Sequence, residues 1–514
     1  SAPLAIEPGE PDKLVDWLNS LRLNIAQRIA LPMKPDNAAV AQAMMVGEMS
    51  GVSQEVGDAM RDAGIYHVLS ISGLHMSLAA GLLYMTVRFL LSLYPRLALR
   101  VPAKKIAAVV GLLGCFVYLL LAGYPVPAVR SFVMVACVML AVLVDRSGIS
   151  VYSLAWAALI ILIWQPEALT GASFQLSFAA TLAILAFYER YSGALFNSSA
   201  RLLRKIWLYF FGLMATSLVA TIATTPLVIY HFNRFSLLGI AANMLMIPLA
   251  SFWIMPAAVI ALLAMPFGLE YWPLTWLDSG IDLMVEGSRW VASFPQAQIM
   301  LPSPTFWGLL LAIYGGLWLC LWQQKWRLLG IIPMLAGMAT ISLHTPYQLL
   351  ISEDGAKVAI LLPERNQFLF LRGTPDSFDA QSWLRAHGMK NGLKISDIKN
   401  EPIAPVCDTV RCIMPYHGKH IAVGLSKKRL EGICAGDVDI VISDALLKDP
   451  ACERVAHVFD ARALERSGSV GIRFTPAGMD IDTANAHRGD RPWVSRRPEH
   501  SALYESTEPD IRKP

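Results

Sequence analysis

A series of apolar runs between residues 74 and 343 constrains the fold more than any other feature of this sequence. Of the 514 residues, 55% are hydrophobic and only 16% are charged, whereas a soluble domain carries about 25% charged residues. A helix that crosses a bilayer needs roughly 20 apolar residues, and several runs are shorter. We predict a polytopic α-helical membrane protein with about ten spans, at 74–94, 106–122, 128–144, 150–164, 173–187, 206–230, 236–251, 252–266, 304–322 and 328–343.

The two runs between residues 236 and 266 are the least regular of these spans. Pro248 and Pro256 interrupt them, and proline removes a backbone hydrogen bond from a helix. We expect either two short spans or a broken or re-entrant hairpin, which membranes tolerate only where protein or water surrounds the irregular backbone. Residues 270–300 mix carboxylates and Arg289 with tryptophans and leucines, which is typical of an amphipathic segment on the membrane surface.

The remaining sequence divides into three parts. Residues 1–66 contain amphipathic stretches without a long apolar run, and we expect them to lie against the membrane domain of residues 67–343. Short β-type runs alternate with helical stretches at 344–483, which predicts a soluble α/β domain. Residues 484–514 are charged and lack apolar periodicity, so we predict a disordered tail. The sequence begins with Ser1, so we expect a fragment or a processed chain.

Clusters of basic residues predict the orientation of the spans, because loops rich in Lys and Arg favour the cytoplasm. They lie between the first two spans, before the sixth and before the last. With ten spans all three clusters fall on one side. The N-terminal segment and the C-terminal domain are then outside the cytoplasm, although one span lost or gained after residue 230 would move the C-terminal domain.

The most distinctive motif lies at the start of the first span. His67 and His75 bracket the sequence Ser70-Ile71-Ser72-Gly73. Polar groups at such a position are costly unless they face protein or water. Gly73 suits a point where backbones or a ligand come close. The alternative is an ordinary helix start with capping serines and an interfacial histidine.

Two further polar patterns lie at the starts of later spans. Arg130 follows the turn Gly123-Tyr124-Pro125-Val126-Pro127, and its guanidinium could bind a phosphate or extend to the lipid headgroups. Ser173 and Ser177 share a helix face, whereas Gln175 points elsewhere. Hydrogen bonding between membrane helices is the alternative role for these three residues.

These motifs, in this order, resemble the competence domain of the ComEC family over residues 40–340. Thr224-Thr225-Pro226, His231 and Asn243 add to the resemblance. It implies an inner-membrane channel that passes single-stranded DNA into the cytoplasm, with a periplasmic DNA receptor and a cytosolic DNA-translocating ATPase as partners. No Gly-x-x-x-x-Gly-Lys-Ser/Thr loop is present, so we do not expect ATP hydrolysis by this chain. The candidate DNA path consists of His67, Ser70, Ser72, Gly73, His75, Arg130, Ser173, Gln175, Ser177, Thr225 and Asn243.

Many proteins of the ComEC family end in a domain that resembles metallo-β-lactamases, and the C-terminal domain here resembles a degenerate form of it. It is degenerate because the His-x-His-x-Asp-His metal motif of metallo-β-lactamases is missing. We therefore predict no catalytic residue, metal or cofactor, and a role in guiding DNA or in assembly. Its four cysteines allow three disulfide pairings. Cys407 with Cys412 and Cys434 with Cys452 is the simplest pairing in an oxidising compartment, with a four-cysteine zinc site or free thiols as alternatives.

Two rival functions come from other classes. An intramembrane metal-dependent hydrolase would use His67 and His75 as ligands or bases, but Glu48 is the only clear carboxylate available to them. A small-solute transporter would usually show inverted repeats, and none is evident. The sequence predicts no particular oligomeric state.

Overall fold

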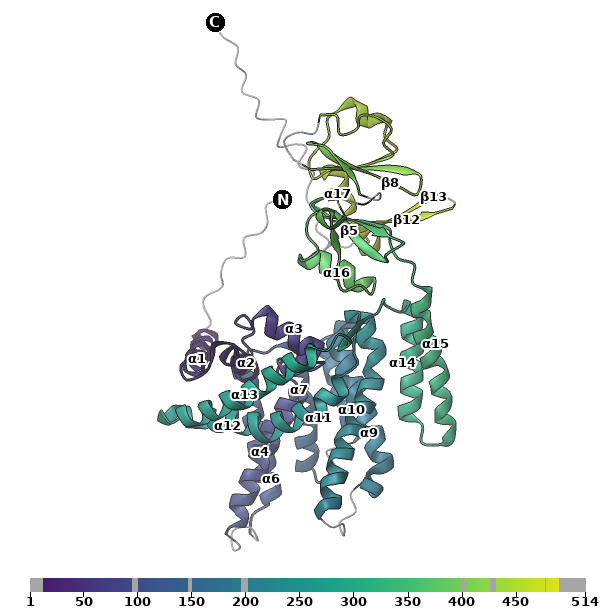
Figure 1. The fold of residues 1–514 in the computed structure, drawn as a ribbon. Coiled ribbons are helices and arrows are strands. Elements are labelled where there is room, and N and C mark those ends of the chain that lie inside the picture. Colours follow the sequence, from purple (N-terminus) through teal and green to yellow (C-terminus); the bar gives the residue numbers. More distant parts are fainter. Residues whose placement is uncertain are drawn as a thin grey trace. The chain divides into compact units, whose positions relative to one another are not determined.

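The computed structural model describes residues 13–94, 100–146, 150–195, 202–398, 401, 404–425, 431–476 and 478–489. The chain divides into two compact units, residues 1–343 and 344–514 (Figure 1). The first is helical and the second contains two β-sheets. This confirms the predicted class, a helical membrane part followed by an α/β domain. Most of the predicted tail, from residue 490 onward, lies outside the described residues.

Three N-terminal helices precede the first long apolar helix: α1 (Lys13–Ala30), α2 (Pro35–Val46) and α3 (Gln54–Asp62). Helix α2 begins with Pro35 in its first turn and ends at Gly47, whose φ of 73° is left-handed. Most residues of α2 are buried, and they belong to a core shared with α11 (Gly239–Leu249), α12 (Met255–Ala264) and α13 (Tyr271–Ala292). These N-terminal helices therefore pack into the first unit.

The apolar helices of the first unit run back and forth along a common direction (Figure 1). Consecutive helices pack against each other as α4 with α6, α9 with α10, and α14 with α15. In the described residues, seven helical runs are long and apolar enough to cross a membrane, and two further apolar helices, α8 and α14, are shorter. The bounds are α4 (Gly73–Ser92), α6 (Ala103–Ala122), α7 (Val126–Leu143), α8 (Val151–Trp164), α9 (Ala172–Leu195), α10 (Leu202–Phe232), α14 (Phe306–Leu321) and α15 (Ile331–Ala339).

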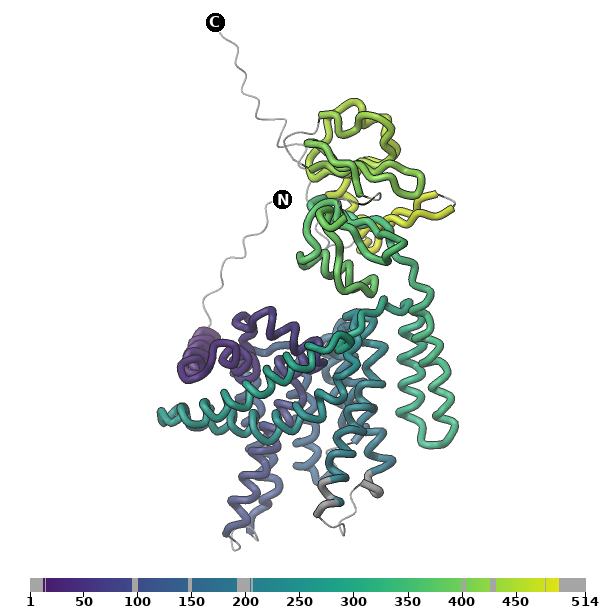
Figure 2. The backbone as a smooth tube through the Cα atoms, viewed as in Figure 1, coloured from purple at the N-terminus to yellow at the C-terminus, as the bar shows by residue number. Residues whose placement is uncertain are grey.

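The prediction of two spans or a hairpin at 236–266 is wrong. The run Gly239–Phe267 is one continuous helix, built from α11 (Gly239–Leu249), a π-helical turn (Ala250–Ile254), α12 (Met255–Ala264) and a final 3₁₀ turn. It packs against α13 (Tyr271–Ala292). In Figure 2 these helices run across the direction of the others rather than along it.

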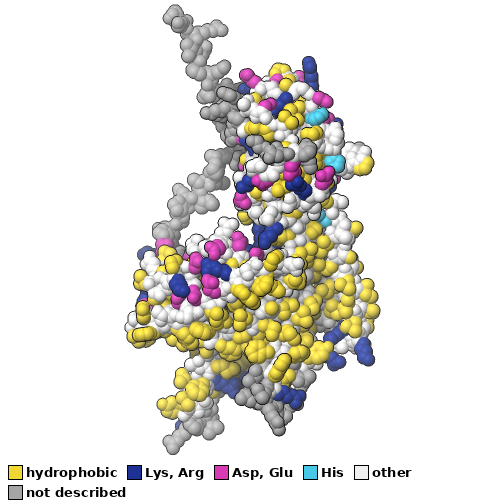
Figure 3. Space-filling view, in the orientation of Figure 1, with side chains coloured by type: hydrophobic (Ala, Val, Ile, Leu, Met, Phe, Trp, Pro, Cys, Tyr) yellow, Lys and Arg dark blue, Asp and Glu magenta, His cyan; other side chains and the backbone are white. Residues whose placement is uncertain are grey.

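Helix α13 is amphipathic and links the N-terminal helices to the membrane helices. On its polar side, Arg289 forms ion pairs with Asp36 of α2, Glu55 of α3 and Glu286 of α13. Exposed aromatic residues, including Trp272 and Trp290, lie elsewhere on the same helix. Figure 3 shows charged side chains above a broad hydrophobic band in this region. The arrangement matches an interfacial helix, with one face for lipid and one for water or polar protein.

The second unit is built from two sheets whose facing apolar side chains form a common core. Helix α16 (Phe378–Ala386) covers the outer face of the first sheet through Ala380 and Leu384. The first sheet has the order β13-β12-β3-β4-β5-β6 and the second β11-β10-β9-β8-β7. The strands are β3 (Leu349–Ile351), β4 (Val358–Leu362), β5 (Gln367–Arg372), β6 (Leu393–Lys394), β7 (Val406–Cys407), β8 (Arg411–Tyr416), β9 (Lys419–Gly424), β10 (Ile440–Ile442), β11 (His457–Phe459), β12 (Val470–Thr475) and β13 (Gly478–Thr483).

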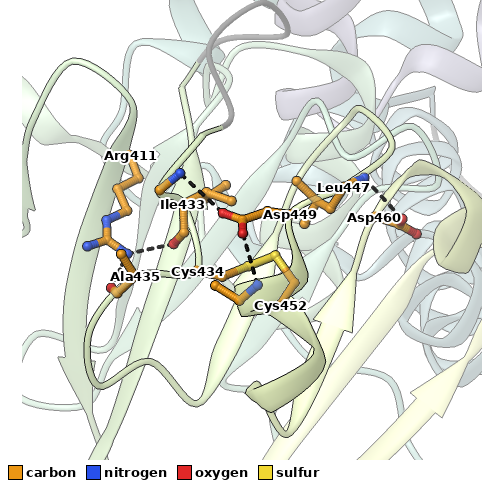
Figure 4. The surroundings of a disulfide bond; sticks show 10 residues. Arg411, Ile433, Cys434, Ala435, Leu447, Asp449, Cys452 and Asp460 are labelled. Atoms are coloured by element: carbon orange, nitrogen blue, oxygen red, sulfur yellow. Dashed lines mark hydrogen bonds between the residues drawn. A yellow bond between two sulfur atoms is a disulfide. The ribbon is translucent and has the colours of Figure 1, made fainter.

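Two disulfides brace the second sheet. Cys407 and Cys412 lie opposite each other on β7 and β8. Cys434 and Cys452 close the segment that covers the outer face of β9 and β10 (Figure 4). Arg411 ties the same segment down by donating hydrogen bonds to the carbonyls of residues 433 and 435, at 2.6 and 2.7 Å. The structure thus contains the simplest of the three possible cysteine pairings.

Candidate functional site

The histidine motif forms the entry to α4. A 3₁₀ turn (Tyr66–Val68) precedes it, and Ser70 Oγ donates a hydrogen bond to the His67 carbonyl at 3.2 Å. At the helix start, Ser72 N–H donates to His75 Nδ1 at 3.3 Å. His75 therefore takes the place that Glu or Gln has in a normal capping box. This part of the motif matches the alternative prediction of an ordinary helix start.

The capping contact also determines which nitrogen of His75 is protonated. A neutral imidazole that accepts at Nδ1 carries its proton on Nε2. The His75 side chain is fully buried, and its Nε2 has no hydrogen-bond partner among the described residues. Buried polar groups normally have a partner. Helix capping alone thus does not account for this side chain, because one donor remains available.

Gly73 does not lie where two backbones come into close contact. Among the described residues outside the local backbone, a Cβ atom placed on it would meet only Ser131 Oγ of α7, at 3.8 Å, which is an ordinary van der Waals distance. The expectation of a close backbone approach is therefore wrong. A role of Gly73 beside a ligand stays a prediction. The contact with Ser131 shows that the first turn of α4 lies against α7.

Arg130 lies near the start of α7 and is only 5% exposed. Its Nε and Nη1 atoms have no hydrogen-bond partner among the described residues. Ala128, two residues earlier, packs in one apolar cluster with Ile71 and Met76 from the start of α4. The Arg130 side chain is thus enclosed by protein, on a helix whose Ala128 lies against the start of α4. Such burial does not match the alternative of a side chain that extends into the headgroups.

The serine and glutamine pattern connects α9 to different neighbours. Gln175 Nε2 donates to the Leu169 carbonyl at 3.0 Å, and Gln175 Oε1 lies 2.9 Å from His231 Nε2 at the end of α10. Ser177 instead faces Met134 of α7. Ser173 is half-buried at the start of α9. Gln175 therefore joins α9 to α10, which matches the helix–helix role considered above.

Thr225 and Asn243 occupy different environments. Thr225 Oγ1 donates to the Thr221 carbonyl of its own helix at 2.7 Å, one residue before Pro226. Its hydroxyl is thus used within α10. Asn243 lies on α11, and its Oδ1 atom is buried without a hydrogen-bond partner among the described residues. Of these two, only Asn243 has a buried polar atom without a partner among the described residues.

A close backbone contact holds the start of α11 against the histidine motif. Gly64 has a φ of 78°, and a Cβ atom there would lie 3.0 Å from the Cα of Gly239, the first residue of α11. Ser236 Oγ also donates to the Asp62 carbonyl at 3.2 Å. The segment before His67 and the helix that carries Asn243 are therefore adjacent, although about 170 residues separate them in the sequence.

The motif residues gather at one end of the membrane helices. Helices α4, α7 and α9 begin there and α10 ends there, while α4, α9 and α14 end, and α6, α10 and α15 begin, at the other end (Figure 1). Basic residues cluster at that other end, and Lys105 pairs with Asp145 there at 2.7 Å. Arg96 and Arg201, which belong to the predicted basic clusters, lie outside the described residues.

Arg22 is a positioning residue that the sequence did not reveal. It lies on α1, and its guanidinium donates to the carbonyls of Leu121 and Val46 at 3.0 and 3.1 Å. These carbonyls are at the C-terminal ends of α6 and α2. Arg22 therefore braces the turn that leads to α7 and Arg130. No sequence signal could have found it, because its partners are 24 and 99 residues away.

The C-terminal unit shows no metal centre: among the described residues, no group of three or more His, Cys, Asp or Glu side chains could hold a metal ion. His417 stacks on Phe474 at 5.6 Å between ring centroids, and His420 lies 3.8 Å from Asp437. His387 accepts a hydrogen bond from Tyr347 N–H at 3.2 Å, and burial lowers its pKa to about 4. This histidine is therefore neutral at physiological pH.

Comparison with known proteins gives matches in the helical part of the chain. The family model described as "Competence protein" matches residues 44–326, more than half of the chain. ComE operon protein 3 of Bacillus subtilis is 29% identical over 272 residues, covering 52% of this chain and 32% of that protein. Competence protein ComA of Neisseria gonorrhoeae is 34% identical over 170 residues, covering 33% of this chain and 24% of that protein.

A protein of unassigned function from Escherichia coli, YcaI, is 29% identical over 325 residues, covering 56% of this chain and 41% of that protein. The chain thus aligns with less than half of the length of each of these three relatives. No solved structure matches. The match at 44–326 contains every residue of the candidate path, from His67 to Asn243.

Proposed function

Because this chain belongs to the competence protein family, we propose that it forms the channel that passes single-stranded DNA across the bacterial inner membrane into the cytoplasm. The observation that carries the proposal is the gathering of path residues from α4, α7, α9 and α11 at one end of the membrane helices. Three of them, His75, Arg130 and Asn243, keep buried polar atoms without a partner among the described residues. Such groups are expensive inside a membrane protein and mark functional paths.

A DNA strand makes demands that these residues can meet. Its backbone is held by cationic groups and its bases by hydrogen bonds or by stacking on aromatic rings. Arg130 supplies a buried cation. Near the start of α9, Phe174 and Phe178 stack at 4.2 Å. The residue types support a path for a charged, aromatic polymer better than one for a small apolar solute.

The proposed orientation places the basic connections in the cytoplasm and the motif end outside it, which is the arrangement that loops rich in Lys and Arg favour. The single helix at 239–267 replaces two predicted spans. If this helix lies across the other helices and does not cross the membrane, the chain has two crossings fewer than the ten predicted. The two ends of the first unit then stay on the same side. DNA would then enter at the motif residues.

We propose a supporting, non-catalytic role for the C-terminal domain outside the cytoplasm. The two facing sheets are compatible with a metallo-β-lactamase-like fold that has lost its metal ligands. The two disulfides support an oxidising compartment. A periplasmic DNA receptor would then supply the strand, and a separate cytosolic ATPase would pull it inward.

The test is an uptake assay in a strain that lacks the gene. Labelled DNA is divided into a nuclease-protected pool outside the inner membrane and a cytosolic pool. We expect DNA to accumulate in the outer pool in the deletion strain, and the wild-type gene to restore cytosolic entry. The His75→Ala variant should fail to restore entry although its membrane level is normal. Normal entry in the deletion strain would refute the channel function.

A further inference from the structure

We infer that the turn between α14 and α15 is a docking surface for the headgroups of anionic phospholipids. The turn consists of residues 322–330, with the sequence Trp-Gln-Gln-Lys-Trp-Arg-Leu-Leu-Gly, and is called the tryptophan turn below. It lies where α14 ends and α15 begins, at the end of the membrane helices opposite the candidate path (Figure 1). The inference concerns contact with the membrane and goes beyond the proposed channel function.

The two helices that flank this turn are held together by their own glycines. Gly308 of α14 faces Gly337 of α15, and Gly315 faces Gly330. A Cβ atom on any of the four would overlap the carbonyl oxygen of the facing glycine, and small residues let membrane helices approach in this way. Outside the pair, α14 packs mainly on α9 and α10. The exposed side chains at the turn therefore need another explanation than helix pairing.

Three tryptophans gather at the turn. The ring centroids of Trp326 and Trp322 are 4.3 Å apart, and those of Trp326 and Trp318 are 4.9 Å apart. Trp318 Nε1 donates a hydrogen bond to the Trp326 carbonyl at 3.3 Å, so this ring fixes the turn. Trp322 and Trp326 are 43% and 39% exposed, and their N–H groups donate to no described residue. Exposed tryptophans of this kind are typical of the membrane–water interface.

The tryptophan turn carries two cations and no anion. Lys325 and Arg327 flank Trp326, with Cα atoms about 3.8 Å from that of Trp326. Neither forms an ion pair with a residue that the structure describes. Arg327 lies close enough to Cys320 of α14 to interact electrostatically with its thiol. The sequence contains no Asp or Glu between residues 287 and 352. The turn therefore presents donors and positive charge without a carboxylate beside them.

An anionic phospholipid supplies the groups that this surface lacks. Its phosphate oxygens accept hydrogen bonds from indole and cationic donors. Its acyl chains can cover Leu321, Leu328 and Leu329, which are all more than half exposed. A zwitterionic lipid also brings an ammonium group, and the turn has no carboxylate to receive it. A nucleic acid brings phosphates without acyl chains, so it would leave the three leucines uncovered. The chemistry therefore favours an anionic lipid.

Lipid retention by the full chain tests this surface. The protein is purified in dodecyl maltoside and titrated with phosphatidylglycerol or phosphatidylethanolamine that carry identical acyl chains. Native mass spectrometry measures the bound lipids at each concentration and gives an apparent Kd for each lipid. A second arm measures the anisotropy of fluorescein-labelled dT20, because a single strand also presents phosphates. The two arms separate a lipid from a nucleic acid as the ligand.

Two double variants separate the charges from the indole donors. Lys325→Gln with Arg327→Gln removes both cations and keeps polar side chains of similar length. Trp322→Phe with Trp326→Phe keeps the aromatic rings and removes the two N–H donors. Thermal unfolding in the same detergent shows whether each variant is folded. A role confined to the structure of the turn would change the unfolding midpoint without changing the preference between the two lipids.

The matched control is Arg100→Gln with Lys104→Gln. Both residues are exposed, and they lie near the start of α6 at the same end of the membrane helices. No tryptophan lies between residues 90 and 114. This control keeps the number of removed charges equal and leaves the tryptophan turn unchanged. It therefore measures the general attraction of an anionic lipid to basic connections.

We expect loss of Lys325 and Arg327 to weaken phosphatidylglycerol binding by roughly fivefold for each charge, or about thirtyfold together. The preference over phosphatidylethanolamine should disappear with it. The Trp322→Phe and Trp326→Phe double variant should weaken both lipids by a similar factor of roughly two to ten, with the preference retained. The control variant should keep both the affinity and the preference.

Three results would overturn the inference. The first is unchanged phosphatidylglycerol binding by the folded Lys325→Gln and Arg327→Gln double variant. The second is an equal loss in the control variant, which would show a general attraction to basic residues. The third is loss of dT20 binding with unchanged lipid binding, which would assign the turn to a nucleic acid. None of them depends on the uptake assay, so failure here leaves the proposed channel function intact.

Discussion

Gly47 shows how a single backbone position fixes the junction between two helices. Its φ of 73° is left-handed, and a Cβ atom there would lie 2.5 Å from the carbonyl oxygen of Ala122 at the end of α6. Gly47→Ala should therefore lower the free energy of unfolding by roughly 2 kcal/mol or more, from backbone strain and from the overlap. The measurement is the thermal unfolding midpoint of the purified chain in one detergent.

Gly81→Ala is the matched control, because no atom of the described residues outside the neighbouring backbone of α4 lies within 4 Å of a Cβ position on Gly81. Alanine there should leave the midpoint unchanged or raise it slightly, since glycine is a poor helix residue. Equal shifts for the two variants would show that Gly47 does not form the tight contact with α6.

For individual residues, the sequence identified the residue types of the candidate site but not their hydrogen-bond partners. The polar residues at the span starts stand out because polar groups are rare in such apolar surroundings. However, the pairing of Gln175 with His231 joins positions 56 apart, and no local pattern encodes it. The sequence also does not predict that His75 Nε2 lacks a partner, since this depends on which ring nitrogen caps the helix.

Among the elements, the helix at 239–267 shows why hydropathy alone misleads. Pro248 and Pro256 suggested a break, but the π-helical turn at Ala250–Ile254 lies between them. A wider turn can absorb the missing hydrogen bond, so the helix continues. Hydropathy also carries no direction, and an apolar run of sufficient length can lie across its neighbours. By contrast, the charges on α13 correctly indicated an amphipathic helix, and its place at the membrane surface stays a prediction.

The two disulfides should stabilise the C-terminal domain to different extents. Cys434 and Cys452 are 18 residues apart and Cys407 and Cys412 only 5. Loop-closure entropy predicts losses of about 3 and about 2 kcal/mol when each pair is changed to alanine. Hydrogen exchange of β9 and β10 in the full chain measures both. Greater loss of protection on removal of the Cys407–Cys412 pair would contradict this entropic ranking.

For the whole molecule, the proposed topology predicts opposite results for reporters placed at two positions. Alkaline phosphatase fused after Leu343 should be active, because this enzyme folds outside the cytoplasm. The same fusion after Arg100, between α4 and α6, should be inactive, whereas green fluorescent protein there should fluoresce. Immunoblots of each fusion control for expression. Phosphatase activity at both positions would refute the assignment of the basic connections to the cytoplasm.

The sequence predicted the division into a membrane part and an α/β part, because composition changes sharply near residue 344. The number of crossings was less secure, because α8 and α14 are shorter than a typical span and the 239–267 helix is long enough to be one. The orientation stays a prediction: it holds if the 239–267 helix does not cross the membrane, and one crossing by this helix would move the C-terminal domain to the other side.

The ion pairs of Arg289 have a consequence for the order of synthesis. Asp36 and Arg289 are separated by 253 residues, which a ribosome adds in roughly 13 to 50 s at about 5–20 residues per second. During that interval α2 is already made, but the helix that covers its apolar residues is not. The N-terminal helices therefore complete their packing late, and a nascent chain that stalls before Tyr271 leaves them without their partner.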